Sequence, residues 1–144
     1  MTITKFIFLL GLVPLIFISN NLFSQSGLDK TRKELLTFIK RPAYANLYPN
    51  INKYDASIVC TSEDGHKIVS YHFNKYGRCN AETYGLLNND KNYKSNWLLL
   101  ENYLKACGYE KSIETDNKYE DTRTRTVAYI ELSGEFLITL FKKY

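Results

Sequence analysis

The side chains best suited to nucleophilic or metal chemistry in this 144-residue sequence are two histidines and three cysteines. One of each lies in the segment KIVSYHFNKYGRC (residues 67–79), where His72 and Cys79 are seven residues apart. An imidazole beside a thiol can take its proton and leave a reactive thiolate. Such a site needs both side chains on one face of the protein. In a β-hairpin, the turn decides which residues share a face.

The turn in this segment favours a register that separates the histidine from the cysteine. Residues 74–77, NKYG, suit a type I turn followed by Gly77 in the left-handed conformation, which forms a G1 bulge. This register pairs Phe73 with Cys79 and Tyr71 with Ala81. The expected apolar face contains Val69, Tyr71, Phe73, Cys79 and Ala81, and the expected polar face contains Ser70, His72, Asn80 and Glu82. The alternative four-residue loop would pair His72 with Cys79 and bury polar groups that lack partners. The sequence therefore predicts a structural hairpin rather than a thiol–imidazole site.

Neither the histidines nor the acidic residues have the spacing of a metal site. His66 and His72 point to the same face of one strand, but six residues of strand separate them by about 20 Å, so we expect two surface histidines. The acidic residues of the long polar stretch near the C-terminus are Glu114, Asp116, Glu120 and Asp121. They lack the alternating acids and glycine of a calcium loop. We expect a solvated loop there, and no metal and no cofactor.

The three cysteines, Cys60, Cys79 and Cys107, leave at least one thiol unpaired. Cys60 and Cys79 are expected on the two strands that flank the middle strand, with Cys60 facing Val69. Two strand spacings are about 9.6 Å, which is beyond disulfide reach. Cys107 could bridge either of the other two, or all three could be small buried apolar residues. The sequence leaves these alternatives open.

Other common catalytic and nucleic-acid-binding signatures are missing from the sequence. It contains no G-x-S-x-G elbow, no glycine-rich phosphate loop and no C-x-x-C pair. The net charge of +4 is mild, and the basic residues are interspersed with acidic ones. Nucleic acid is therefore not an expected partner, and no catalytic residue is assigned.

The elements that would position these side chains follow from the hydrophobic pattern. A helix is expected between Ser26 and Arg41, with capping-box spacing at Thr31 and Glu34, and Pro42 ends it. A second helix carries an apolar stripe through Tyr93, Trp97, Leu100, Leu104 and Cys107. We expect Trp97, Leu100 and Leu104 to pack on the strand that contains Val69, Tyr71 and Phe73. Strands are expected over 56–61, 67–73, 78–84, 124–132 and 136–141. The predicted fold is a single two-layer α+β domain in the order α-β-β-β-α-β-β, with an antiparallel sheet of about five strands and two helices on one face.

The first 26 residues have the layout of a secretory signal peptide. Lys5 precedes the apolar run 6–18, which is too short to span a bilayer comfortably. Small residues suit cleavage between Phe23 and Gly27, either with Ser24 at the −1 position or with Ser26 there. We expect a signal peptide over 1–26 and one domain over 27–144, exported to the periplasm or secreted. An uncleaved membrane anchor is the alternative.

The segment YHFNKYGRC, an aromatic strand followed by a glycine turn and a cysteine, resembles that of small exported Bacteroidota proteins of unassigned function. The residues LFSQ at positions 22–25 are similar to the ends of signal peptides from the same group. The resemblance covers Leu28 to the C-terminus. It implies no activity and transfers no functional residue.

Two functions remain from the sequence. The favoured one is a non-catalytic exported binding or accessory module, such as an inhibitor, an immunity-type protein or an envelope-assembly protein. We expect its partner to be a protein or an envelope component, and we expect no stable membrane anchor after cleavage. The alternative is a small exported enzyme that uses Cys107 or an acid pair from 114–121. A deep pocket with perturbed titratable groups would favour the enzyme, and a shallow aromatic patch would favour binding.

Overall fold

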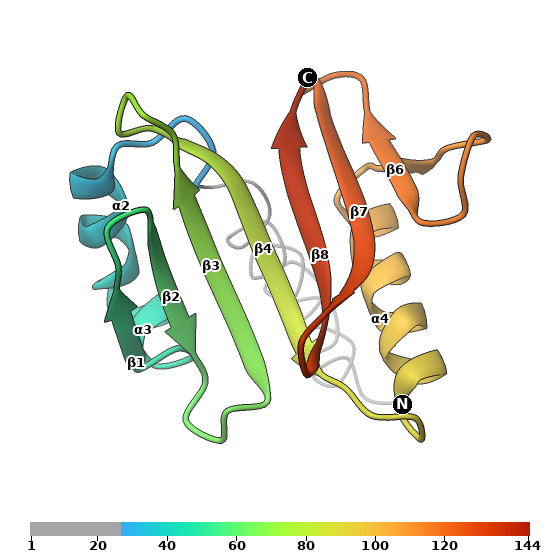
Figure 1. Cartoon of the computed structure of the whole chain (residues 1–144), viewed down its shortest axis with the longest axis horizontal. Coiled ribbons are helices and arrows are strands. Elements are labelled where there is room, and N and C mark those ends of the chain that lie inside the picture. The colour runs from blue at the N-terminus through green and yellow to red at the C-terminus, as the bar shows by residue number, and fades with distance from the viewer. Residues whose placement is uncertain (1–26) are drawn as a thin grey trace, which may run out of the picture.

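The computed structural model describes residues 27–144, which form one eight-stranded antiparallel sheet with three helices against one face (Figure 1). The strand order is β1-β2-β3-β4-β8-β7-β6-β5. The strands are β1 (Asn50–Lys53), β2 (Ser57–Thr61), β3 (Lys67–Phe73), β4 (Cys79–Leu87), β5 (Glu110–Lys111), β6 (Lys118–Asp121), β7 (Thr126–Ser133) and β8 (Phe136–Lys143). The helices are α2 (Arg32–Ile39), α3 (Pro42–Ala45) and α4 (Tyr93–Ala106). A single α+β domain is confirmed.

The predicted number of five strands is wrong, because three short polar strands lacked a hydrophobic signal. The sequences of β1, β5 and β6 are NINK, EK and KYED. β1 and β5 are the two edges of the sheet. Short, charged edge strands hinder pairing with other chains. The composition of β1 and β5 suits their place at the edges, but it lacks the alternating apolar residues from which a strand is predicted.

The first helix has the predicted capping box but is shorter than expected. Thr31 is the N-cap: its backbone N–H donates to Glu34 Oε2 at 2.7 Å, and the Glu34 N–H donates to Thr31 Oγ1 at 3.3 Å. The chain turns after Lys40, and Pro42 opens the short helix α3 instead of the expected loop. Proline suits the first turn of a helix because the N–H that it lacks would have no partner there.

The second predicted helix, α4, covers a different part of the sheet from the one expected. It was expected to pack Trp97, Leu100 and Leu104 on β3, but it lies over β7 and β8 (Figure 1). The chain leaves β4 near the middle of the sheet and enters β5 at its far edge, so the connecting helix must cross the intervening strands. Leu100 and Leu104 are fully buried, whereas Trp97 is only half-buried.

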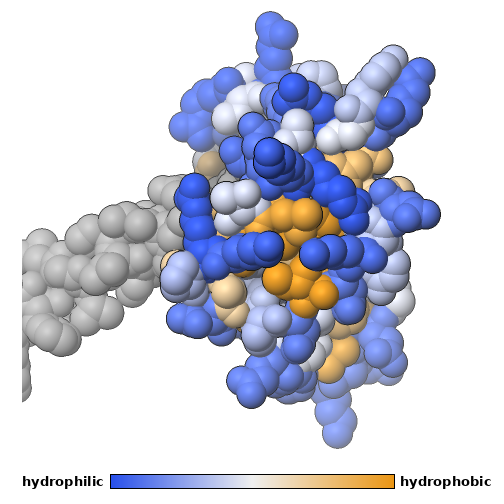
Figure 2. Space-filling view, turned by 90° about the vertical axis from the view of Figure 1, so that its left-hand side faces the viewer, coloured by the Kyte–Doolittle hydropathy of each residue, from blue (hydrophilic) through white to orange (hydrophobic). Residues whose placement is uncertain are grey.

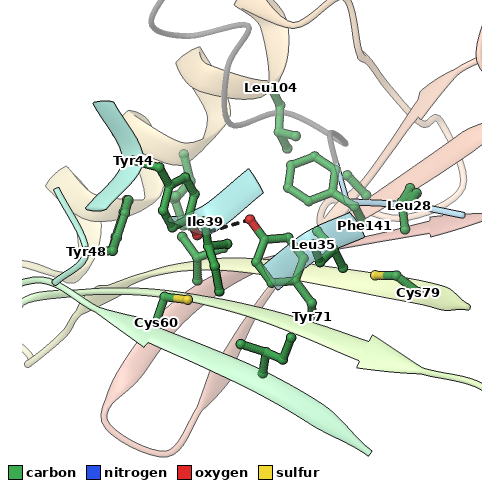
Figure 3. Packing of buried hydrophobic residues seen from close by; sticks show 14 of the residues in the cluster. Leu28, Leu35, Ile39, Tyr44, Tyr48, Cys60, Tyr71, Cys79, Leu104 and Phe141 are labelled. Carbon is green, nitrogen blue, oxygen red and sulfur yellow. Dashed lines mark hydrogen bonds between the residues drawn. The ribbon is translucent and has the colours of Figure 1, made fainter. Parts of the chain in front are cut away.

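The core lies between the sheet and the helices (Figure 3). Leu35 and Ile39 of α2 are fully buried. Tyr44 of α3 and Tyr71 of β3 join their hydroxyl groups by a hydrogen bond of 3.0 Å. This bond satisfies polar atoms whose burial would otherwise cost free energy. Burial of each large apolar side chain contributes about 1.5–3 kcal/mol. No helix within residues 27–144 is long and apolar enough to cross a membrane.

The hairpin at Gly77 has the predicted turn. Gly77 has a φ of 74° and donates its N–H to the Asn74 carbonyl at 2.9 Å. Phe73 pairs with Cys79, as predicted. Cys79 is buried on the helix-covered face and His72 is exposed. The two side chains lie on opposite faces, so the predicted absence of a thiol–imidazole pair is confirmed.

One residue beyond this turn, the predicted register is wrong. Asn80 has no partner on β3: Phe73 pairs with Cys79, but His72 pairs with Ala81. This second bulge shifts the rest of β4 by one residue, so Tyr71 pairs with Glu82 instead of Ala81. Since side chains alternate along a strand, Glu82 turns from the expected polar face into the core.

Candidate functional site

A surface hollow of about 510 Å³ lies where the chain after α3 and the β2–β3 turn come together beside β4 and α4. The described residues that line it are Asn46, Leu47, Tyr48, Ser62, Glu63, Asp64, Lys67, Tyr84 and Tyr103. They come from five parts of the chain. The fold is therefore needed to assemble the hollow, and no local sequence motif marks it.

Three tyrosines give the hollow its apolar lining. The rings of Tyr84 and Tyr103 have centroids 5.4 Å apart, and Tyr48 packs on Tyr44 at 5.2 Å. Burial raises the pKa of Tyr48, Tyr84 and Tyr103 above the ordinary value of a phenol. All three are therefore neutral at physiological pH. They offer ring surface for binding but no phenolate for catalysis, and the Tyr103 hydroxyl is itself buried.

The rim of the hollow carries charge of both signs. Ser62 Oγ donates to Asp64 Oδ1 at 2.6 Å, and the His66 backbone N–H donates to the same oxygen at 3.0 Å. These hydrogen bonds lower the pKa of Asp64, so it is ionised at neutral pH. Glu63 adds a second acid, and Lys67 contributes a cation that enters no ion pair among residues 27–144.

A second unusual feature is the carboxyl group of Glu82, which is only 1% exposed. The backbone N–H of Gly27 donates to its Oε2 at 3.0 Å. Burial raises the pKa of Glu82 to about 8, although this hydrogen bond partly offsets the effect. Within the described chain no ion pair includes Glu82, and it does not line the tyrosine-lined hollow.

The two histidines lie at separate surface positions, as predicted. His66 is exposed, with Nδ1 3.3 Å from Asp64 Oδ2. His72 lies on the face of the sheet away from the helices, where its Nε2 is 3.1 Å from Ser70 Oγ. Burial lowers the pKa of His72. In the part of the chain that the structure describes, no three histidine, cysteine or acidic residues gather as a metal site.

Cys60, Cys79 and Cys107 form no disulfide among residues 27–144. Cys60 faces Val69, as predicted, and both Cys60 and Cys79 are buried in the core. Burial raises the pKa of Cys60 to about 11 and that of Cys79 to about 12, so neither forms a thiolate at neutral pH. Cys107 caps the end of α4 and is half-buried. The possible disulfide between Cys107 and a strand cysteine is not formed.

The acidic stretch 114–121 is more structured than the expected solvated loop, because β6 runs through it. Lys118 Nζ lies 2.8 Å from Glu114 Oε2 and 2.7 Å from Glu120 Oε1. Asp121 is buried. Burial opposes its ionisation, but hydrogen bonds from Arg123 outweigh that effect and lower its pKa. Basic side chains therefore balance the acids, so the stretch does not offer an acid pair for catalysis.

The side of the molecule formed by α2, α3 and β1 exposes apolar surface ringed by hydrophilic residues (Figure 2). Part-buried apolar side chains of α2 and β1 are Leu36, Phe38 and Ile51. Scattered surface of this kind is common in soluble domains.

Sequence reasoning missed both the tyrosine-lined hollow and the inward-facing Glu82. Tyr84 follows Glu82 by two residues, so the two side chains share a face of β4. An assignment of Tyr84 to the apolar face would have predicted the shifted register, and this was the one signal for it in the sequence. No protein family, curated protein or solved structure matches this chain.

Proposed function

We propose that this chain is a non-catalytic binding module, exported to the periplasm or the cell exterior, that recognises a protein partner through the tyrosine-lined hollow. The observation that carries the proposal is the lining itself: neutral, part-buried tyrosines surrounded by charges of both signs. Tyrosine is enriched in protein interfaces because it offers a large contact area at little cost in conformational entropy.

The partner that suits this surface is a protein segment that packs one apolar or aromatic side chain against the exposed edges of these rings. Aromatic pairs gain about 0.5–1.5 kcal/mol beyond the area that they bury. Leu47, which is half-exposed at the edge of the hollow, extends the apolar contact. Lys67, Glu63 and Asp64 would then set the orientation of the partner by charge rather than add much affinity.

The alternative of a small exported enzyme has less support. The buried thiols have raised pKa values, Cys107 does not line the hollow, and the acids of 114–121 are paired with basic side chains. The one carboxyl group with a strongly raised pKa, Glu82, is only 1% exposed and does not line the tyrosine-lined hollow, so a substrate there would not reach it.

Site-specific photocrosslinking in the native envelope tests the proposal. A photoreactive amino acid at Leu47 should capture a defined protein, and the same group at Ile113, which is fully exposed between β5 and β6 and does not line the hollow, should not. A charge reversal, Lys67→Glu, should reduce capture from position 47 without unfolding the protein, because it places a like charge beside Glu63 and Asp64 and misorients the partner. Equal capture from both positions, or capture that ignores Lys67→Glu, would contradict the proposal.

A further inference from the structure

The carboxyl group of Glu82 is an acid in the core that lacks a basic side chain as partner. It lies on β4, opposite Tyr71 of β3 on one side and Phe141 of β8 on the other. Together with burial, the charge of Glu82 raises the pKa of four nearby groups, all of which are neutral at physiological pH: Tyr71, Cys79, Tyr103 and Tyr109. An ionised buried carboxylate is costly unless a cation and hydrogen bonds accompany it. The described residues supply one hydrogen bond and no cation.

That single hydrogen bond comes from the backbone nitrogen of Gly27, whose position is fixed by the chain that follows it. The Asp29 N–H donates to the Cys79 carbonyl at 2.8 Å, and the Cys79 N–H donates to the Lys30 carbonyl at 2.9 Å. Arg78 Nη1 donates to the Asp29 carbonyl at 2.9 Å, and the side chains of Lys143 and Asp29 form an ion pair. This segment is thus tied to the start of β4 and to the end of β8.

The space around Gly27 admits only a glycine. A Cβ atom at this position would lie 2.5 Å from two ring carbons of Tyr71 and 3.0 Å from Glu82 Oε2. The first distance is far below ordinary contact, and the second is a few tenths of an ångström too short. Residue 27 therefore places its backbone nitrogen directly against the buried carboxyl group, in an arrangement that a larger residue could not adopt without displacing the Tyr71 ring.

The sequence places a candidate cleavage position immediately before this nitrogen, with Ser26 at −1 and Ser24 at −3. We propose that a signal-peptidase-type endopeptidase hydrolyses the Ser26–Gly27 bond, and that the new α-ammonium group of Gly27 forms an ion pair with the buried carboxylate of Glu82. Water supplies the hydroxyl group that completes the Ser26 carboxyl, and the amine released on Gly27 takes up a proton. The proposal rests on the export proposed above, but not on the binding role.

Processing would change the ionisation of Glu82. Before cleavage, the Gly27 nitrogen is an amide with one N–H, and Glu82 is protonated at neutral pH because its pKa is raised to about 8. After cleavage, the same nitrogen carries a positive charge and three N–H groups about 3 Å from the carboxylate, and an adjacent opposite charge lowers a carboxyl pKa. Glu82 would therefore have a cationic partner only in the processed protein.

The test compares full chains that are exported with cleavage either allowed or blocked. Ser26→Ala keeps a small residue at −1 and should release a chain that begins at Gly27. Ser26→Tyr should block cleavage at this bond, so that Gly27 stays an internal residue. Intact mass gives the N-terminus, and isotope-edited infrared spectroscopy of labelled glutamate distinguishes the acid from the carboxylate, with Glu82→Gln identifying the band.

We expect the native protein to begin at Gly27 and Glu82 to be a carboxylate at pH 7 in the Ser26→Ala protein but an acid in the Ser26→Tyr protein. A native chain that begins at Gln25 would overturn the ion pair and leave export intact, and a chain that retains Met1 would overturn both. If Glu82 is an acid at pH 7 in a chain that begins at Gly27, the pairing is wrong. The Ser26→Tyr and Ser26→Ala proteins contain the same glutamates, so a protonated-carboxyl band at pH 7 that is present in the first and absent from the second decides the matter even if Glu82→Gln fails to fold.

Discussion

Replacement of Glu82 by glutamine should stabilise the uncleaved chain and destabilise the processed one. Glutamine keeps the size of the side chain and an oxygen that can accept the Gly27 N–H, but it cannot ionise. In the uncleaved chain the pKa of Glu82 is about 8, against 4.5 for an unperturbed glutamate. A raised folded-state pKa contributes stability that is fully present below about pH 4.5 and is lost as the pH rises towards 8.

The size of this effect follows from the difference between the two pKa values. At about 1.4 kcal/mol per pKa unit, the uncleaved chain should lose about 3 kcal/mol of stability between pH 4 and pH 7, and about 5 kcal/mol by pH 9. Glu82→Gln should flatten this slope, so the variant should be the more stable protein at pH 9. In the processed chain the same change would leave a buried ammonium group without its partner, which costs about 3–5 kcal/mol.

Urea unfolding measured by the fluorescence of Trp97, the one tryptophan of the chain, gives these values at pH 5, 7 and 9. The Ser26→Tyr and Ser26→Ala backgrounds supply the uncleaved and processed chains. If Glu82→Gln shifts stability in the same direction in both backgrounds, or if stability of the uncleaved protein does not depend on pH, the reasoning from the buried carboxyl group is refuted.

Three further predictions concern the elements around this group. Gly77→Val should lower the free energy of unfolding by about 1–3 kcal/mol, because a β-branched residue is strained at a φ of 74°. His72→Ala is a surface change and should lower it by less than about 1 kcal/mol. Chemical denaturation compares the two variants directly, and a larger loss for His72→Ala would contradict the assigned turn. Gly27→Ala should destabilise by about 1–3 kcal/mol through overpacking against the Tyr71 ring, and an unchanged melting temperature would show that the ring moves aside freely. In the native protein a thiol reagent should modify Cys107 well before the buried Cys79, with mass spectrometry of digested peptides as the readout; equal rates would mean that the core opens readily.

The parts of the fold that the sequence predicted are those with a strong local signal. The capping box at Thr31 and the positive φ at Gly77 depend on a few adjacent residues, and both are present. The apolar runs of β3 and β8 identify them as strands. In contrast, β1 and β5 exist because a neighbouring strand offers hydrogen bonds along its edge. Nothing in the four residues NINK or the two residues EK specifies that pairing.

The position of α4 was beyond local reasoning for a related reason. Its apolar stripe predicts that one face is buried, but not which strands it covers. That depends on where β5 joins the sheet, and β5 itself is too short to predict. The buried face also contains Asn96, whose amide nitrogen donates to the Leu87 carbonyl at 3.1 Å. The buried face thus includes a polar residue whose amide is satisfied by the last residue of β4, whereas Trp97 of the predicted apolar stripe is only half-buried.

The extra residue Asn80 connects the two features that local patterns did not predict. With the predicted register, Ala81 would face the helices, and Glu82 and Tyr84 would face away from them. The unpaired Asn80 reverses this alternation, so Tyr84 reaches the wall of the hollow beside Tyr103. The same reversal carries Glu82 to the nitrogen of Gly27. Because side chains alternate strictly along a strand, Tyr84 cannot enter the helix-covered face without Glu82. A buried acid is therefore the consequence of the bulge that builds the tyrosine wall, and the ammonium group that we propose at residue 27 is the cation that would let this acid ionise.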